Sequence, residues 1–276
     1  MKADAFLKQA AIVVGERADD YGPASVLFER IAKRWSLTLG YNDGIAGSAV
    51  QFATSTFYPV PAPGALALLP LPGLAAGRVI AAHLGNGASL CAMLAGTSVD
   101  SSMGFTALEG LMMGTRSGAI DPGVLLHLLE EGHSAADLTQ LLYKKSGLLG
   151  ISGLAADMRT LRKSQQASAR LAIEMFTHRV VREAGAMTAC LQGLDVLVFT
   201  GGIGEHDALL RRDVCSCLSY LNIVMDEEKN TQATGEQIMR IDAVGSRVEV
   251  WVIPTDEGRM AALSACNLLL AKHQSA

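Results

Sequence analysis

The sequence predicts an α/β fold for the part of the chain that begins near residue 78. Short apolar strands alternate there with longer amphipathic helices, which is the pattern of a sheet covered by helices. Two of these strands run directly into glycine-rich turns, and half of the 276 residues are hydrophobic. Because only 5% are aromatic, aliphatic and small side chains must fill the core. A chain of this length buries a core as one large domain or two modest ones.

The individual elements follow from the hydrophobic period and from the turn residues. A hairpin is expected around Gly85-Asn86-Gly87, and Ala95-Gly96 marks a second turn. Strands are expected at residues 79–83, 89–94, 98–102, 196–199 and 248–253. Helices are expected at residues 122–131, 135–144, 155–163, 166–192 and 256–270, with a further one starting near 208. Ser134 is expected to N-cap the second of these helices, and residues 146–153 are expected to form a glycine-rich loop.

The first 77 residues differ from the rest in composition and in hydrophobic pattern. Apolar residues recur at helical spacing within residues 2–40, with a break at Tyr21-Gly22-Pro23. Part of this segment weakly resembles a small helical family found in phage genomes. Residues 41–77 are crowded with proline and glycine and lose nearly all charge after Asp43, which is typical of a linker. We therefore expect a helical segment at 1–40, a linker or a poorly specified segment at 41–77, and an α/β domain at 78–276.

Composition argues against several classes of partner. The net charge of −4 and the lack of any run of lysine or arginine give no field for binding nucleic acid. The longest apolar run, residues 62–74, is interrupted by three prolines and is too short to cross a bilayer. Acidic residues near the N-terminus are unlike a secretory signal, so a cytoplasmic protein is expected. The five cysteines are scattered without the spacing of a zinc site.

Two glycine-rich turns could approach a phosphate group. Residues 200–205 (TGGIGE) lie where an apolar strand turns into a helix, and residues 83–89 (HLGNGAS) carry His83 and Asn86 at the mouth of the turn. Glycines in such turns let the backbone approach a phosphate or a ribose closely. Each turn also has a plain structural interpretation, as a packing turn or as an ordinary Asn-Gly hairpin. Two such turns in one α/β domain are what the ATP site of actin, hexokinase and the sugar kinases needs.

Two further motifs carry charge. Arg116 lies between glycines in Gly114-Thr115-Arg116-Ser117-Gly118, and a guanidinium matches phosphoryl oxygens with paired hydrogen bonds. Pro254-Thr255-Asp256-Glu257 places two carboxylates at the start of the last expected helix. A surface arginine in a loop, and simple capping of a helix, are the alternatives for these two motifs.

Five sequence runs together resemble one enzyme family, in the order in which that family carries them. The runs are HLGNGAS (83–89), SVDSSMGFTALEGLMMGTRSG (98–118), KKSGLLGISG (144–153), FTGGIGE (199–205) and VIPTDE (252–257). They are similar to the acetate/propionate kinase (acetokinase) family, and the similarity extends from about Arg78 to the last expected helix. The resemblance implies the C-terminal, nucleotide-binding domain of an actin-like (ASKHA) kinase. It also implies transfer of the γ-phosphoryl group of ATP to a short-chain carboxylate, with Mg²⁺, in a homodimer.

The resemblance also implies roles for particular residues. A loop on the ATP phosphates would comprise His83, Gly85, Asn86 and Gly87, and Arg116 would be the catalytic arginine that stabilises the phosphoryl group in transfer. The adenosine side would comprise Asp157, Met158 and Arg159. The loop under the adenine and ribose would comprise Gly202, Ile203, Gly204, Glu205 and His206, where most family members carry Asn in place of His206. Glu257 would be the ligand linked to magnesium.

The sequence also departs from the family pattern. The family's Asn-x-Gly-Ser-Ser-Ser, His-Gly-Gly and His-Gly-Thr-Ser-His motifs do not occur in it. Phe52-Ala53-Thr54 is similar to the family's Phe-Asp-Thr, with Ala53 in place of a catalytic aspartate, so a vestigial kinase segment is the alternative to a linker at 41–77. Ala119 stands where the family usually has Asp. We therefore expect impaired phosphotransferase activity, because phosphoryl transfer depends on positioning. An inactive nucleotide-binding remnant and an interaction protein remain as alternatives, and the sequence does not choose between acetate and propionate.

Overall fold

The structure is a computed structural model that describes residues 77–104 and 106–254. The helical segment expected at 1–40, most of the linker at 41–77, the helix expected at 256–270 and Glu257 lie outside the described residues. The described part contains a six-stranded mixed sheet with the strand order β3-β2-β1-β4-β6-β5. These strands are β1 (Arg78–Leu84), β2 (Ala88–Leu94), β3 (Thr97–Ser101), β4 (Val196–Thr200), β5 (Met239–Arg240) and β6 (Glu249–Val252). Except for the short β5, all were predicted.

Both predicted turns join antiparallel strands, but by different geometries. Residues 85–87 join β1 to β2, and the amide of Gly85 donates to the carbonyl of Gly87 at 2.9 Å. Neither Asn86 nor Gly87 has the positive φ that a type I′ Asn-Gly turn requires. That conformation occurs instead in the two-residue turn between β2 and β3, where φ is 48° at Ala95 and 75° at Gly96. The hairpin prediction is therefore confirmed, with a wider tip than an ordinary Asn-Gly turn.

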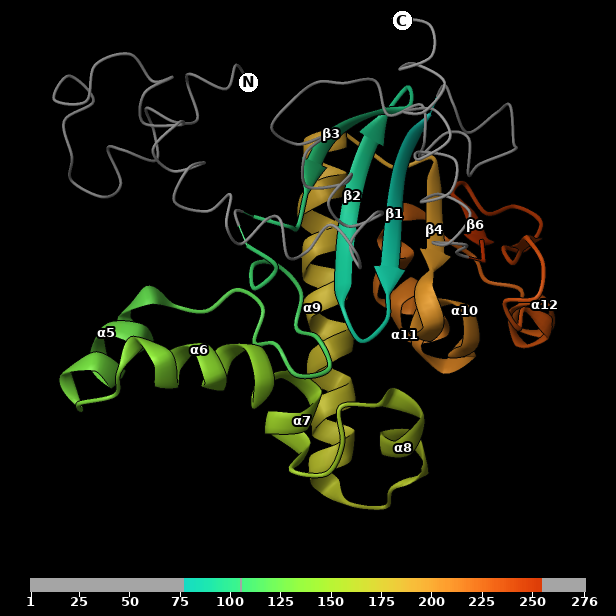
Figure 1. Ribbon diagram of the computed structural model, residues 1–276. Helices are drawn as coiled ribbons and strands as arrows, with labels where there is room; N and C mark the ends of the chain where they lie inside the picture. Colours follow the sequence, from blue (N-terminus) through green and yellow to red (C-terminus); the bar gives the residue numbers. More distant parts are fainter. Residues whose placement is uncertain (1–76, 105, 255–276) are drawn as a thin grey trace, which may run out of the picture. The chain divides into compact units, whose positions relative to one another are not determined.

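A long helix, α9 (Ala167–Leu191), lies against β1, β2 and β3 (Figure 1). Its buried face includes Ile173, Phe176 and Val180, which pack into the core together with Ile80 and Leu90 of the sheet. The helix α11 (Ala208–Cys217) packs against α9 as well. These contacts bury a continuous aliphatic core, as the composition predicted.

The region around the next two helices follows the prediction closely. The helices α5 (Pro122–Glu130) and α6 (Ala135–Lys144) extend away from the sheet (Figure 1). Ser134 caps α6 in a reciprocal capping box with Asp137, because each side chain bonds to the other's backbone amide. None of the residues of α5 is buried, although that helix is rich in leucine.

Two segments expected to be loops are helical instead. Residues 146–153 contain the helix α7 (Gly147–Ser152), so the prediction of a glycine-rich loop is wrong. Gly147 starts this helix with a φ of +64°, and the amide of Leu148 donates to the carbonyl of Met113 at 2.9 Å. The buried Leu148 holds the short helix onto the core. The glycine turn after β4 is likewise a short helix, α10 (Gly201–His206). The helix expected at 155–163 starts later, as α8 (Met158–Lys163).

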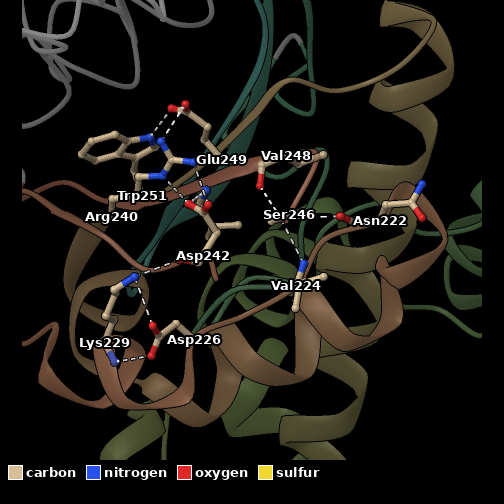
Figure 2. Close-up of polar contacts among 11 residues, drawn as sticks. Asn222, Val224, Asp226, Lys229, Arg240, Asp242, Ser246, Val248, Glu249 and Trp251 are labelled. Atoms are coloured by element: carbon tan, nitrogen blue, oxygen red, sulfur yellow. Dashed lines mark hydrogen bonds and ion pairs between the residues drawn. The ribbon is translucent and has the colours of Figure 1, made fainter. Parts of the chain in front are cut away.

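The sequence predicted only part of the outer edge of the sheet. A 3₁₀ turn, η3 (Ser219–Leu221), and the helix α12 (Glu227–Gln232) lead to β5, which pairs with β6. Figure 2 shows the hydrogen bonds and ion pairs of the polar side chains at this edge. Asp242 is buried, accepts two hydrogen bonds of 2.8 Å from Arg240, and accepts another from the amide of Val250 at 3.0 Å. This polar network holds a strand of two residues that carries no hydrophobic period.

Candidate functional site

The two predicted glycine turns meet at one edge of the sheet. Because β1 and β4 are parallel and His83 is in register with Thr200, both strands end side by side (Figure 1). Gly201 has a φ of +77°, and an ideal Cβ atom on it would lie 2.8 Å from the carbonyl oxygen of Leu84. A Cβ on Gly85 would lie 3.9 Å from the amide nitrogen of Gly202. Backbone therefore touches backbone here, and a side chain at Gly201 could not be accommodated.

The loop that carries Arg116 lies against the first glycine turn. The amide of Gly114 donates to the carbonyl of Asn86 at 3.0 Å, and a Cβ on Gly114 would lie 2.1 Å from Oδ1 of Asn86. A Cβ on Gly87 would lie 3.9 Å from Nη1 of Arg116. The same Nη1 donates to the carbonyl of Ala107 at 3.3 Å. The structure thus places the predicted catalytic arginine beside the predicted phosphate loop.

The Asp157-Met158-Arg159 segment is joined to the same loop. A Cβ on Gly114 would lie 3.0 Å from the carbonyl oxygen of Ala156. Asp157 N-caps α8, and the hydroxyl of Thr160 donates to its Oδ2 at 2.6 Å, which holds the pKa of that carboxyl below its usual range. Met158 is buried, whereas the side chain of Arg159 is 86% exposed. Only the outer two residues of this triplet are accessible to a ligand.

An ion pair joins α8 to the second glycine turn. Nε of Arg162, in α8, donates to Oδ2 of Asp207 at 3.0 Å. Asp207 is the residue between α10 and α11, and its Oδ1 accepts from the amide of Leu210 to cap α11. Four segments are therefore linked in a closed ring of contacts: residues 83–87, 114–116, 156–162 and 201–207. We call this arrangement the motif ring.

Within the second turn the predicted residues fall into two groups. Gly202 and His206 are exposed and Ile203 is half-buried, so all three are open to a ligand. Gly204 and Glu205 are buried, and Oε1 of Glu205 accepts from the amide of Gly201 at 2.8 Å. Glu205 therefore holds the shape of the turn from below.

Arg211 is a site residue that the sequence analysis missed. Its side chain is fully buried, and its guanidinium donates to the carbonyls of Gly204 and Glu205 at 2.8 Å each. It also donates to Oδ1 and to the carbonyl of Asn230 and to the carbonyl of Ala233, so all five donors are used. Burial lowers the pKa of Arg211 to about 10. This arginine fixes the end of α10 from inside the protein.

Arg179 is a second missed residue. From α9 its Nη2 donates to the carbonyls of Gly110 at 3.3 Å and Ala119 at 2.8 Å, which closes the base of the loop that carries Arg116. Nothing in the local sequence marks either arginine, because each lies on a regular helix and outside the glycine motif that it holds. Their signal would be a charged residue on the buried face of a helix.

The part of the chain that the structure describes contains no group of three or more metal-ligating side chains. Glu257, the expected magnesium ligand, lies outside it. None of the helices within residues 77–104 and 106–254 combines the length and apolarity needed to cross a membrane.

Comparisons with known proteins show the family to which this chain is related. A family model described as the acetokinase family matches residues 70–263. The acetate kinase of Rhodopseudomonas palustris (strain TIE-1) is 53% identical over 190 residues, which are 68% of this chain and 47% of that protein. The acetate kinase of Rickettsia akari is 47% identical over 181 residues, or 65% of this chain and 46% of that protein. The chain thus spans about half the length of the curated relatives it matches.

Solved structures show the same fold. The crystal structure of Porphyromonas gingivalis acetate kinase matches with a TM-score of 0.69 and 42% identity, over 78% of this chain and 54% of that one. A propionate kinase from Francisella tularensis matches with a TM-score of 0.64 and 40% identity, over 75% of this chain and 53% of that one. The described sheet and helices therefore have the fold of the C-terminal domain of an actin-like kinase. On this evidence the chain belongs to the acetokinase family.

Proposed function

We propose that this chain binds an adenine nucleotide, ATP or ADP with Mg²⁺, at the motif ring. In this proposal it forms the nucleotide-binding part of a phosphotransferase that acts on a short-chain carboxylate. The observation that carries the proposal is the closure of the ring. It brings four segments, more than 100 residues apart at their extremes, into one set of contacts next to the ends of β1 and β4.

The phosphate end of the site is proposed to lie at the first glycine turn. Asn86 is exposed at its tip, and Arg116 is half-buried beside Gly87. The guanidinium of Arg116 has a long bond to the carbonyl of Ala107 and a contact of 3.6 Å with Sδ of Met113, so most of its donors remain for a ligand. A fixed cation at this place would stabilise the charge that spreads over the oxygens of a transferring phosphoryl group.

The adenosine end is proposed to lie between α8 and α10. Gly202 faces open space, because a Cβ built on it meets no atom within 4 Å. His206 and Arg159 are both exposed, and each offers a flat group against which a base can lie. The predicted Met158 and Glu205 support this end from the buried side.

Magnesium is proposed to bind together with the nucleotide. The described residues hold no cluster of three ligating side chains, so a Mg²⁺ ion here would take most of its ligands from phosphate oxygens and water, as it commonly does. Glu257 remains the proposed protein ligand. The ion would neutralise charge on the phosphates.

Calorimetry with MgADP tests the proposed site. We expect measurable heat and an upward thermal shift for the full chain, and weaker binding by at least about tenfold for Arg116→Ala, because charge-assisted contacts are worth more than 1 kcal/mol. Arg212→Ala is the matched control, since Arg212 is an exposed arginine that pairs with its neighbour Asp213. Absence of both heat and thermal shift would exclude a nucleotide site.

A second copy of the chain is the proposed protein partner. The helix α5 has no buried residue, and Val124, Leu126 and Leu129 are exposed by 43%, 61% and 47%. An apolar helix that projects from the sheet is typical of a surface covered by another subunit. We propose that α5 lies in the interface of a homodimer.

A further inference from the structure

The ring has one junction that differs from the other three. Residues 83–87, 114–116 and 156 meet through backbone atoms and glycines, and residues 201–202 meet residues 84–85 in the same way. Between α8 and the corner after α10, the contact is a side-chain ion pair, Arg162 with Asp207. These residues are 45 positions apart, and neither lies in the motifs that predicted the site.

From this geometry we infer that Arg162 is a positioning residue: its pair with Asp207 sets the spacing of α8 and α10 and so tunes the affinity for the adenosine part of a nucleotide. The inference rests on the proposed function. It concerns the two segments that would flank adenosine, one starting at Met158 and the other ending at His206. Arg162 follows Met158 in the same helix, and Asp207 directly follows His206.

The environment of the pair favours positioning over general stabilisation. The two side chains are 23% and 13% exposed, so solvent screens their attraction only in part. Yet the guanidinium makes one bond rather than two, and its Nη2 is buried without a hydrogen-bond partner among the described residues. A buried donor left unsatisfied removes much of the stability that an ion pair would otherwise give. Asp207 would keep the hydrogen bond from the amide of Leu210 after the pair is lost. We therefore expect loss of the pair to lower stability by less than a fully satisfied buried pair would, and to change the spacing of the two segments.

Asp207 has separate tasks for its two carboxylate oxygens. Oδ1 caps α11 by accepting from Leu210, and Oδ2 accepts from Arg162. A substitution of Asp207 would disturb the helix cap as well as the pair. Arg162 is therefore the better residue to change, because Asp157, and not Arg162, provides the N-cap of α8.

The test compares MgADP and inorganic tripolyphosphate, each titrated into the full chain and its variants. We expect Arg162→Met to weaken MgADP about tenfold and to leave tripolyphosphate affinity unchanged, since tripolyphosphate has no adenosine. Arg162→Lys keeps the charge and can still donate to Asp207, so it should retain most of the MgADP affinity. Arg212→Met, which removes the same charge from an exposed pair on α11, should behave as wild type.

Two results would overturn the inference while the proposed function stands. One is equal MgADP affinity in wild type and Arg162→Met. The other is a parallel loss of MgADP and tripolyphosphate affinity with a lowered Tm, which is what a merely structural residue would give. A wild-type chain that binds no MgADP would instead overturn the proposed function itself.

Discussion

The glycines of the motif ring differ in how closely other atoms surround them. Substitutions at different glycines should therefore affect the stability of the fold and the binding of a ligand separately. Gly114 is enclosed, since a Cβ on it would lie 2.1 Å from Oδ1 of Asn86 and 3.0 Å from the carbonyl oxygen of Ala156. Gly202 faces open space on the same ring. The two positions therefore make a matched pair of Gly→Ala substitutions.

We expect Gly114→Ala to lower both stability and MgADP affinity. The new methyl group must push Asn86 and the backbone at Ala156 apart, and overpacking of this kind costs about 1–3 kcal/mol. Urea unfolding and calorimetry would measure the two effects. By contrast, Gly202→Ala should unfold like wild type and weaken MgADP alone, because its methyl group would enter the ligand space. Equal stability of wild type and Gly114→Ala would contradict the close approach of Asn86.

Arg211 provides a second prediction at the residue scale. Replacing it with Met would leave four buried carbonyl groups, in α10, in α12 and at the C-cap of α12, without their donor. We therefore expect a loss of about 3 kcal/mol or more in the free energy of unfolding. The neighbouring Arg212 is exposed, and Arg212→Met should change stability by less than about 0.5 kcal/mol. Similar unfolding midpoints for the two variants would show that the buried guanidinium is dispensable.

At the scale of elements, prediction succeeded where periodicity was long or turn residues were strong. The helix expected at 166–192 is α9, with Gln166 and Gln192 as its caps. The short helices α7 and α10 were missed because their glycines are poor helix formers. They also depend on distant segments: Leu148 of α7 donates to the carbonyl of Met113, and Gly201 of α10 closely approaches Leu84. For α12 and β5 the cause is polarity: the Arg240–Asp242 network replaces the hydrophobic pattern that sequence analysis detects.

The candidate site also contains residues that have a local sequence signal and residues that depend on distant contacts. Local motifs predicted the turn at Asn86, the loop of Arg116 and the turn at Gly202, and the structure brings them together. Arg162 and Arg179 could not be predicted, because each acts on a segment reached only through the fold. Arg211 lies near Gly204 in the sequence, but its contacts with Asn230 and Ala233 depend on the fold. Glycine motifs can be recognised in the sequence, whereas the arginines that hold them have no local sequence signature.

The β2–β3 turn gives a prediction at the element scale. Ala95 has a φ of 48°, in a region that costs an L-residue with a Cβ about 1–2 kcal/mol and that Asn tolerates better. Ala95 is exposed, and Asn-Gly is the preferred pair for a type I′ turn. We expect Ala95→Asn to stabilise the chain by about 0.5–1 kcal/mol, measured as a higher urea midpoint with an unchanged slope. Ala95→Val should do the opposite, since a β-branched residue is disfavoured at this φ.

At the scale of the whole molecule, the exposed face of α5 predicts an oligomer. Light scattering should show a dimer for the full chain, and Leu126→Asp should shift it toward a folded monomer, because that side chain is 61% exposed within one chain. Val244→Asp is the control, since Val244 is fully exposed in a loop elsewhere on the molecule. A monomer for the wild-type chain would refute the proposed interface.

Activity requires a site for the phosphoryl group and, in line with it, a site for the carboxylate acceptor. Arg116 is placed to stabilise a phosphoryl group in transfer, yet an arginine helps only a transfer whose acceptor is aligned. The family motifs implied in holding a carboxylate do not occur in the printed sequence, and Ala53 stands in place of an aspartate. Positioning of reactants can contribute about 7–11 kcal/mol, more than Arg116 could offset.

We therefore expect a polypeptide of residues 1–276, assayed by itself, to form acyl phosphate from acetate or propionate at background rates. Trapping the product with hydroxylamine would measure this, and Arg116→Ala should leave the reading unchanged even though it weakens MgADP binding. That combination, binding that depends on Arg116 without turnover, separates a nucleotide site from a complete enzyme. Turnover that Arg116→Ala abolishes would contradict the expectation, and it would require that residues 1–77 hold the carboxylate in line with the nucleotide.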